Sequence, residues 1–308
     1  MWELSAGIFM GWSLGSNDAA NFFGTGVGAK IITYRKATLL ISIFVVIGAL
    51  LEGEKCFATV GEISRLDLKM AFFTTLSAGI MVTLFTYFGL PTSTSQAIIG
   101  ALLGGGLYLG KADFSKLYKI VVCWILTPVG ALIISYLLYH LLGRVVNQYL
   151  KRPLLRDALI KGGLVLSGCF GAYALGSNNV ANVTGVYVST GTLSPFYGAL
   201  IGSLSIAFGV LTYSGKVMET VGRKIVAMDS YSAFIAGLGS ALIVWIFTQV
   251  GVPVSSSQSV VGAVAGVGLV KGIRAVSIKS LVEIVVGWIS TPLTGGILCY
   301  ILVALFYR

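Results

Sequence analysis

Two polar motifs that could bind ions interrupt apolar stretches of this chain. Residues 15–21 read Gly-Ser-Asn-Asp-Ala-Ala-Asn, and residues 176–182 read Gly-Ser-Asn-Asn-Val-Ala-Asn. A carboxylate and amides in apolar surroundings are costly, and they are tolerated where the backbone lines a cavity or packs inside the protein. Their oxygens are hard donors, which suit Na⁺ or a proton better than a transition metal. The two motifs therefore predict a cation site.

A second pair of motifs carries hydroxyl groups. Residues 91–96 read Pro-Thr-Ser-Thr-Ser-Gln, and residues 253–258 read Pro-Val-Ser-Ser-Ser-Gln. Pro suits the first turn of a helix and Ser or Thr caps it, so each motif predicts a helix that begins at membrane depth. The free N–H groups and positive dipole end of such a helix can hold an anion without a buried Lys or Arg.

These motifs place fifteen candidate site residues around one expected pocket near the bilayer midplane. We expect the anion to contact Asn17, Thr92, Ser93, Thr94, Ser95, Asn178, Ser255, Ser256 and Ser257. We expect the cation to contact Asp18, Asn21, Gln96, Asn179, Asn182 and Gln258. The alternative for each of these residues is a packing role, because Ser, Thr, Asn and Gly also join helices in membranes.

The order of the motifs indicates that the chain is duplicated. The first motif recurs after 161 residues and the second after 162, and Trp-Ile-Leu-Thr-Pro at 124–128 is matched by Trp-Ile-Ser-Thr-Pro at 288–292. Three matches in the same order at a nearly constant offset indicate two homologous halves. We place the first membrane repeat at 1–145, a basic connecting loop at 146–158 and the second membrane repeat at 159–308.

The composition indicates that the elements carrying these motifs are surrounded by lipid. Hydrophobic residues make up 56% of the chain and charged residues 10%, with a mean hydropathy of +0.92. Apolar runs of helix-spanning length recur without the alternation of a barrel strand, which predicts an all-α integral membrane protein. The net charge of +10 does not indicate nucleic acid, because the basic residues lie in short loops, as topology signals and lipid contacts do. The four cysteines are too far apart to indicate a metal site or a disulfide framework.

Each half contains five apolar segments, and an odd number of crossings would invert the second half relative to the first. The segments lie near 6–30, 37–53, 70–89, 92–110 and 116–142, and near 159–190, 196–214, 231–250, 254–270 and 279–306. An N-terminus outside the cell places fourteen of the 21 Lys and Arg residues inside, as the positive-inside rule favours. Re-entrant hairpins in place of the 92–110 segment and its partner would make the count even and weaken this argument, unless the Gly-Ser-Asn segments are also broken.

At these motifs the chain resembles the inorganic phosphate transporter (PiT) family, whose halves each carry a Gly-Ala-Asn-Asp-Val-Ala-Asn-Ala-like signature and a Pro-Val-Ser-Thr-Thr-like cluster. The resemblance covers nearly the whole chain. It implies two inverted-topology repeats with discontinuous or re-entrant helices, an external N-terminus, and phosphate uptake coupled to Na⁺ or H⁺. Many relatives have an intramembrane Glu where this chain has Val45-Val46 and Gly237, and His where it has Gln96 and Gln258. The loss of these titratable groups favours sodium over the proton.

We therefore expect a secondary active transporter of the cell membrane, multi-pass with its N-terminus outside, that imports inorganic phosphate by symport with sodium. The sequence contains no Ser/His/Asp grouping, HExxH or P-loop, so we expect neither an enzyme nor direct use of ATP. The expected partners are phosphate, sodium as the coupling ion and the lipid bilayer, with no cofactor and no nucleic acid. A homodimer, proton coupling, another oxyanion such as sulfate, and an anion channel remain alternatives.

Overall fold

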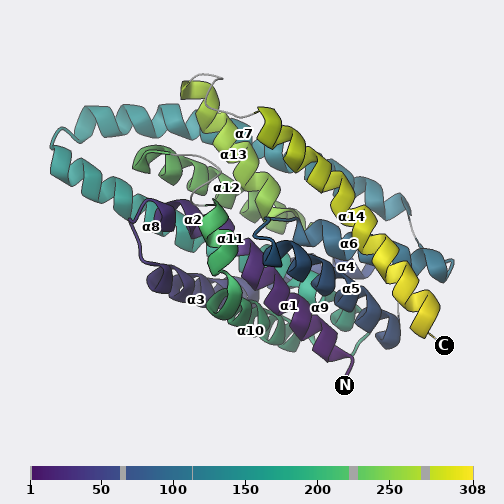
Figure 1. The fold of residues 1–308 in the computed structure, drawn as a ribbon. Helices are drawn as coiled ribbons and strands as arrows, with labels where there is room; N and C mark the ends of the chain where they lie inside the picture. Colours follow the sequence, from purple (N-terminus) through teal and green to yellow (C-terminus); the bar gives the residue numbers. More distant parts are fainter. Residues whose placement is uncertain (1, 63–66, 113, 222–227, 272–277, 308) are drawn as a thin grey trace.

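The computed structural model describes residues 2–62, 67–112, 114–221, 228–271 and 278–307 (Figure 1). Within these ranges every regular element is a helix, and seven helical spans are long and apolar enough to cross a membrane. The predicted all-α membrane fold is confirmed.

The first half contains eight helical elements: α1 (Leu4–Asp18), α2 (Ala20–Gly28), α3 (Tyr34–Glu52), the 3₁₀ helix η1 (Gly53–Cys56), α4 (Phe57–Glu62), α5 (Leu68–Tyr87), α6 (Thr94–Tyr108) and α7 (Phe114–Tyr149). The second half contains seven in its described part: α8 (Pro153–Asn179), α9 (Ala181–Ser189), α10 (Pro195–Tyr213), α11 (Gly215–Thr220), α12 (Ser230–Val250), α13 (Ser256–Lys271) and α14 (Ile278–Phe306).

The two halves are interlocked. Helix α1 packs on α10 while its repeat equivalent α8 packs on α3, and α6 packs on α14 while α13 packs on α7. Each of these pairs joins one half to the other, so neither half completes its own core. The helix pairs therefore repeat with a pseudo-twofold relation, as expected for a duplicated chain.

The segments 70–89 and 92–110 form a hairpin. Helix α6 turns back along α5, so that Gly105 lies beside Met70 and Thr74, near the start of α5. Helix α13 turns back along α12 in the same way, with a hydrogen bond between Ser240 and Ser259.

The hairpins change the number of crossings without changing its parity. Five crossings in each half, considered above, are reduced to three: α1 with α2, then α3, then α7. The chain enters and leaves a hairpin at the same side of the membrane, so a hairpin adds no crossing and the number stays odd. The second half is therefore inverted relative to the first. Figure 1 accordingly shows both chain termini at the same end of the molecule, which we call the terminal end.

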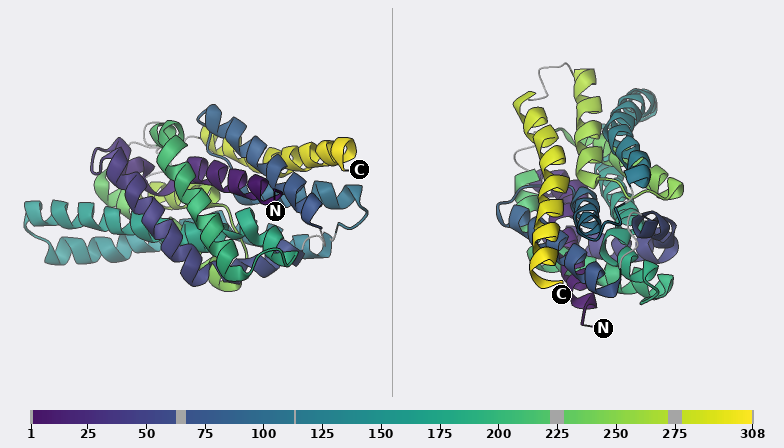
Figure 2. Two further views of the ribbon diagram at one scale, coloured as in Figure 1. Left: turned by 90° about the horizontal axis from the view of Figure 1, so that it is seen from below. Right: turned by 90° about the vertical axis from the view of Figure 1, so that its right-hand side faces the viewer.

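The opposite end carries most of the positive charge, and we call it the basic end. Figure 2 shows the end of α7 and the start of α8, which meet in a turn, extending beyond the other helices there. Helix α7 ends at Tyr149 and α8 begins at Pro153, so little of the predicted connecting loop is free of helix. The basic residues of this turn are Arg144, Lys151, Arg152, Arg156 and Lys161.

Small residues let the short hairpin arms approach the long helices closely. A Cβ atom on Gly100 would lie 2.1 Å from the carbonyl oxygen of Pro292, and one on Gly262 would lie 2.1 Å from that of Pro128. Close packing of this kind is typical of glycine in membrane helices. It fixes the positions from which α6 and α13 begin.

Candidate functional site

The two polar motifs and the two hairpin tips meet in the interior of the protein. Of the fifteen predicted site residues, Ser257 is half-buried and all the others are buried. The motif 15–21 spans the junction of α1 and α2, and the motif 176–182 spans the junction of α8 and α9. The structure thus brings together residues that lie up to 241 positions apart in the sequence.

The helices that begin at the tips are capped by Ser hydroxyls as predicted, whereas Pro91 and Pro253 lie before the caps and not in the first turn. The Ser93 hydroxyl accepts a hydrogen bond from the backbone N–H of Gln96, at the start of α6. The Ser255 hydroxyl accepts one from the backbone N–H of Gln258, at the start of α13. Each cap satisfies one of the free N–H groups of the first turn.

Asn17 holds the tip of the first hairpin. Its Nδ2 donates to the Thr86 hydroxyl at 2.9 Å and to the Leu90 carbonyl at 3.0 Å, and its Oδ1 accepts from the Thr92 N–H at 3.0 Å. The amide thus bonds to a backbone carbonyl before Pro91 and to a backbone N–H after it, as a neighbouring strand would in a sheet.

Asn178 holds the second tip by equivalent bonds. Its Nδ2 donates to the Thr248 hydroxyl and to the Val252 carbonyl, each at 3.1 Å, and its Oδ1 accepts from the Val254 N–H at 2.8 Å. In both of these asparagines, predicted to contact the anion, Nδ2 and Oδ1 are each hydrogen-bonded to the loops. Their role toward an anion remains a prediction.

The last asparagine of each motif reaches the other half. Asn21 donates to the hydroxyls of Ser256 at 2.9 Å and Ser257 at 3.3 Å, and Asn182 donates to the Ser95 hydroxyl at 2.8 Å. Each motif therefore binds its own hairpin through its first asparagine and the opposite hairpin through its last.

The two hairpin tips also bind each other directly. The Ser95 hydroxyl donates to the Val254 carbonyl at 2.9 Å, and the Ser257 hydroxyl donates to the Thr92 carbonyl at 2.7 Å. The room expected between the clusters is therefore closed at these contacts. An anion can use these hydroxyls as donors only after the bonds between the tips part.

Asp18 is the acidic residue of the cluster. It is 1% exposed, and its Oδ2 accepts a hydrogen bond from the Thr94 hydroxyl at 2.7 Å. At the equivalent position, the Oδ1 of Asn179 accepts from Ser95 and from Asn182, each at 2.8 Å. The duplicated site thus has a carboxylate on one side and an amide on the other.

Several buried oxygens of this cluster have no hydrogen-bond donor. They are Asp18 Oδ1, Gln96 Oε1, Asn182 Oδ1 and Gln258 Oε1, and one donor, Asn179 Nδ2, is also unpaired. All five atoms belong to predicted cation ligands. A buried acceptor without a donor is unfavourable, and a hard cation satisfies several such oxygens at once. The donor set therefore fits sodium.

Some residues at the site were not predicted from the sequence. Thr86 and Thr248, which receive the asparagine bonds, are 162 positions apart, so the repeat offset could have identified them. Thr291, whose hydroxyl lies 3.2 Å from that of Thr92, belongs to the third repeated motif, which contributed no residue to the predicted site.

The chain is similar to phosphate transporters over almost its whole length. The sequence model of the phosphate transporter family matches residues 14–158 and again residues 151–299. A protein of Methanocaldococcus jannaschii, which carries the provisional name of phosphate permease, is 33% identical over 97% of this chain and 95% of its own length. A similarly named protein of Pyrococcus furiosus is 29% identical over 96% of this chain and 93% of its own length. The solved structure titled "The sodium-dependent phosphate transporter" superposes with a TM-score of 0.87 at 25% identity, covering 99% of this chain and all of that one.

Proposed function

This chain belongs to the phosphate transporter family, and from that premise we propose that it imports inorganic phosphate by symport with sodium. It is a multi-pass membrane transporter and not an enzyme. The proposal concerns the coupling ion, the direction of transport and the cell membrane as its location.

The unpaired oxygens around Asp18 are the observation that carries the sodium assignment. A proton on Asp18 would account for two of these oxygens at most, the one that carries it and one that accepts its hydrogen bond, whereas four buried oxygens are without a donor. Among the described residues, no Lys, Arg or His side chain is hydrogen-bonded to this cluster. A small hard cation supplies the missing positive charge and accepts several oxygen ligands.

Coupling follows from the proximity of the cation ligands to the hydroxyl donors. The carboxylate of Asp18 repels an anion, and a sodium ion bound to it removes that repulsion. The same Thr94 that donates to Asp18 starts α6, whose first turn we expect to face phosphate. Sodium therefore raises the affinity for phosphate, and phosphate raises the affinity for sodium by the same factor.

The basic end is assigned to the cytoplasm. The α7–α8 turn and the start of α3, with Arg35 and Lys36, carry basic residues at this end. By the positive-inside rule, on which the orientation expected from the sequence also rests, both termini then lie outside.

Uptake by purified protein in liposomes tests the proposal. We expect labelled phosphate to accumulate under an inward sodium gradient, and we expect an equal potassium gradient to give no accumulation. A proton gradient without sodium separates proton coupling from sodium coupling, and excess sulfate tests the specificity for phosphate. Accumulation that is the same with potassium as with sodium contradicts sodium coupling, and no accumulation under any gradient contradicts phosphate symport.

A further inference from the structure

The segments that follow α3 and α10 hold the hairpin tips of the opposite halves. At the terminal end, the Thr59 hydroxyl of α4 donates to the Gly251 carbonyl at the tip of the second hairpin. At the basic end, the Lys216 ammonium of α11 donates to the Tyr87 carbonyl and lies 4.8 Å from the centre of the Tyr87 ring. Both tips contain a glycine with a left-handed backbone, Gly251 at φ 78° and Gly89 at φ 69°.

A carboxylate strengthens the contact at the terminal end. Glu52 accepts hydrogen bonds from Lys55 at 2.8 Å, from the Trp245 indole at 3.0 Å and from the Gln249 amide at 3.2 Å. Lys55 also donates to the Gln249 oxygen at 2.6 Å. Trp245 and Gln249 belong to the last turns of α12, so Glu52 ties the second hairpin to the first half.

The duplication provides an internal comparison for this group. In this part of the repeat the offset is 161, because Gly24 packs against Val221 as Gly185 packs against Val60. The residue equivalent to Glu52 is therefore Tyr213, whose ring stacks on that of Trp12 with the centroids 5.4 Å apart. Lys216 is equivalent to Lys55, so in the described chain a lysine holds the hairpin at both ends, whereas the carboxylate occurs at the terminal end alone.

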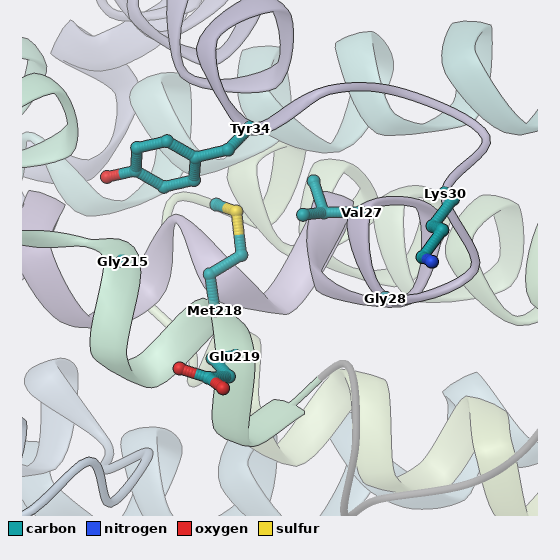
Figure 3. Close-up of a pocket in the computed structure, with 7 residues that line it drawn as sticks. All are labelled: Val27, Gly28, Lys30, Tyr34, Gly215, Met218 and Glu219. Atoms are coloured by element: carbon teal, nitrogen blue, oxygen red, sulfur yellow. The ribbon is translucent and has the colours of Figure 1, made fainter.

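The packing below the Lys216–Tyr87 contact at the basic end is looser than the packing below the Thr59–Gly251 contact at the terminal end. At the basic end a cavity of about 410 Å³ lies between α2 and α11, where Figure 3 shows Met218 rising toward Tyr34 and Val27, with Lys30 and Glu219 at its edge.

The residue equivalent to Met218 at the terminal end is Phe57, which is 4% exposed, and its neighbour Cys56 is 0% exposed. Phe57 packs beside Gly198, and the Cys56 sulfur lies 3.8 Å from Asn178 Nδ2. The terminal end is thus filled where the basic end is hollow.

We infer that Glu52 is a positioning residue that latches the second hairpin and keeps the terminal end of the transport site closed. The latch acts through Trp245 and Gln249 on the tip that carries Val254 and the Ser255–Ser257 hydroxyls. Its place in a transport cycle rests on the proposed function, whereas its effect on the hairpin does not. When the latch opens, the path from the terminal end to Asn178 passes Cys56.

The native Cys56 thiol reports the latch directly. In lipid nanodiscs we expect Glu52→Ser, which removes the carboxylate, to raise the rate of Cys56 modification by a charged maleimide about tenfold or more, because charge-assisted hydrogen bonds are lost. Lys216→Ser, at the basic end, is the matched control and leaves the Cys56 rate unchanged. Peptide mass spectrometry identifies which of the four cysteines reacts.

Reaction of all four cysteines in Glu52→Ser would show that this variant is unfolded. A second variant then keeps the test decisive. Gln249→Ala removes the partner on the hairpin and is expected to raise the Cys56 rate in the same way. Wild-type Cys56 rates in the folded variants would overturn the latch even if sodium-driven phosphate uptake is found. Faster Cys56 modification without any phosphate uptake would support the latch and reject the proposed function.

Discussion

Replacing Asp18 by Asn removes the acidic charge from the site while leaving its shape intact. The Oδ1 of an asparagine can still accept the hydrogen bond that the Thr94 hydroxyl donates to Asp18. The second half shows that an asparagine fits this environment, because Asn179 occupies the equivalent position. We therefore expect the Asp18→Asn protein to fold and to lose its response to sodium.

The size of the effect follows from the charge. A cation 4 Å from a unit negative charge gains about 4 kcal/mol at an effective dielectric constant of about 20. Because 1.4 kcal/mol corresponds to a factor of about ten, the affinity for sodium should fall about a thousandfold. A protein that is half-saturated at millimolar sodium would then show no saturation at any practical concentration.

Phosphate uptake into liposomes, measured as a function of sodium concentration, tests this expectation. Sodium binding to the purified protein without phosphate gives a second measurement that does not depend on transport. Asp157→Asn is the matched control, because this aspartate is exposed on α8 and pairs with Lys161. An unchanged half-saturating sodium concentration in Asp18→Asn would refute the assignment of Asp18 as a sodium ligand.

Three further predictions concern stability. Gly100→Leu places side-chain atoms against the Pro292 carbonyl and should destabilise the protein by about 1–3 kcal/mol or more, measured by thermal unfolding in detergent. Asn178→Ala removes three hydrogen bonds from the second tip and should lower the unfolding temperature even without ligands; an unchanged temperature contradicts its structural role. Burial raises the pKa of Asp229, but hydrogen bonds from Lys271 and Ser232 outweigh it and lower this pKa to about 2. Its stabilisation is therefore present above about pH 4 and lost as the pH falls toward 2, so wild type and Asp229→Ala should converge in unfolding temperature over that range.

Local patterns allowed much of the site to be predicted. Pro and Ser at the hairpin tips predict helix starts, and Ser93 and Ser255 cap α6 and α13 as expected. The duplication predicts that equivalent residues meet, and the bonds of Asn17 and Asn178 repeat at the same offset. These features depend on neighbouring residues or on the repeat, which can both be read from a sequence.

The hairpins could not be predicted in the same way. Helix α5 has 20 residues, which is long enough to cross a bilayer, so its length does not distinguish a crossing from a hairpin arm. The return of α6 depends on contacts such as that of Gly105 with Met70. No local pattern records which helix such a glycine will meet.

The hydrogen bonds of Glu52 could not be predicted from the repeated motifs either. Glu52 is the last residue of α3 and belongs to no repeated motif, and its partners Trp245 and Gln249 follow almost 200 positions later. The positions equivalent to these residues in the other half have different residue types, so the repeat offset gives no signal. Only the three-dimensional arrangement shows that they form one unit.

The bond between Asn21 and Ser256 has a consequence for biosynthesis. These residues are 235 positions apart, so at about 5–20 residues per second the ribosome needs roughly 10–50 s to make the second after the first. During that interval the newly inserted first repeat holds Asn21 in the bilayer without its final partner. Nascent chains that stop before the second hairpin should therefore be recognised by membrane quality-control proteases.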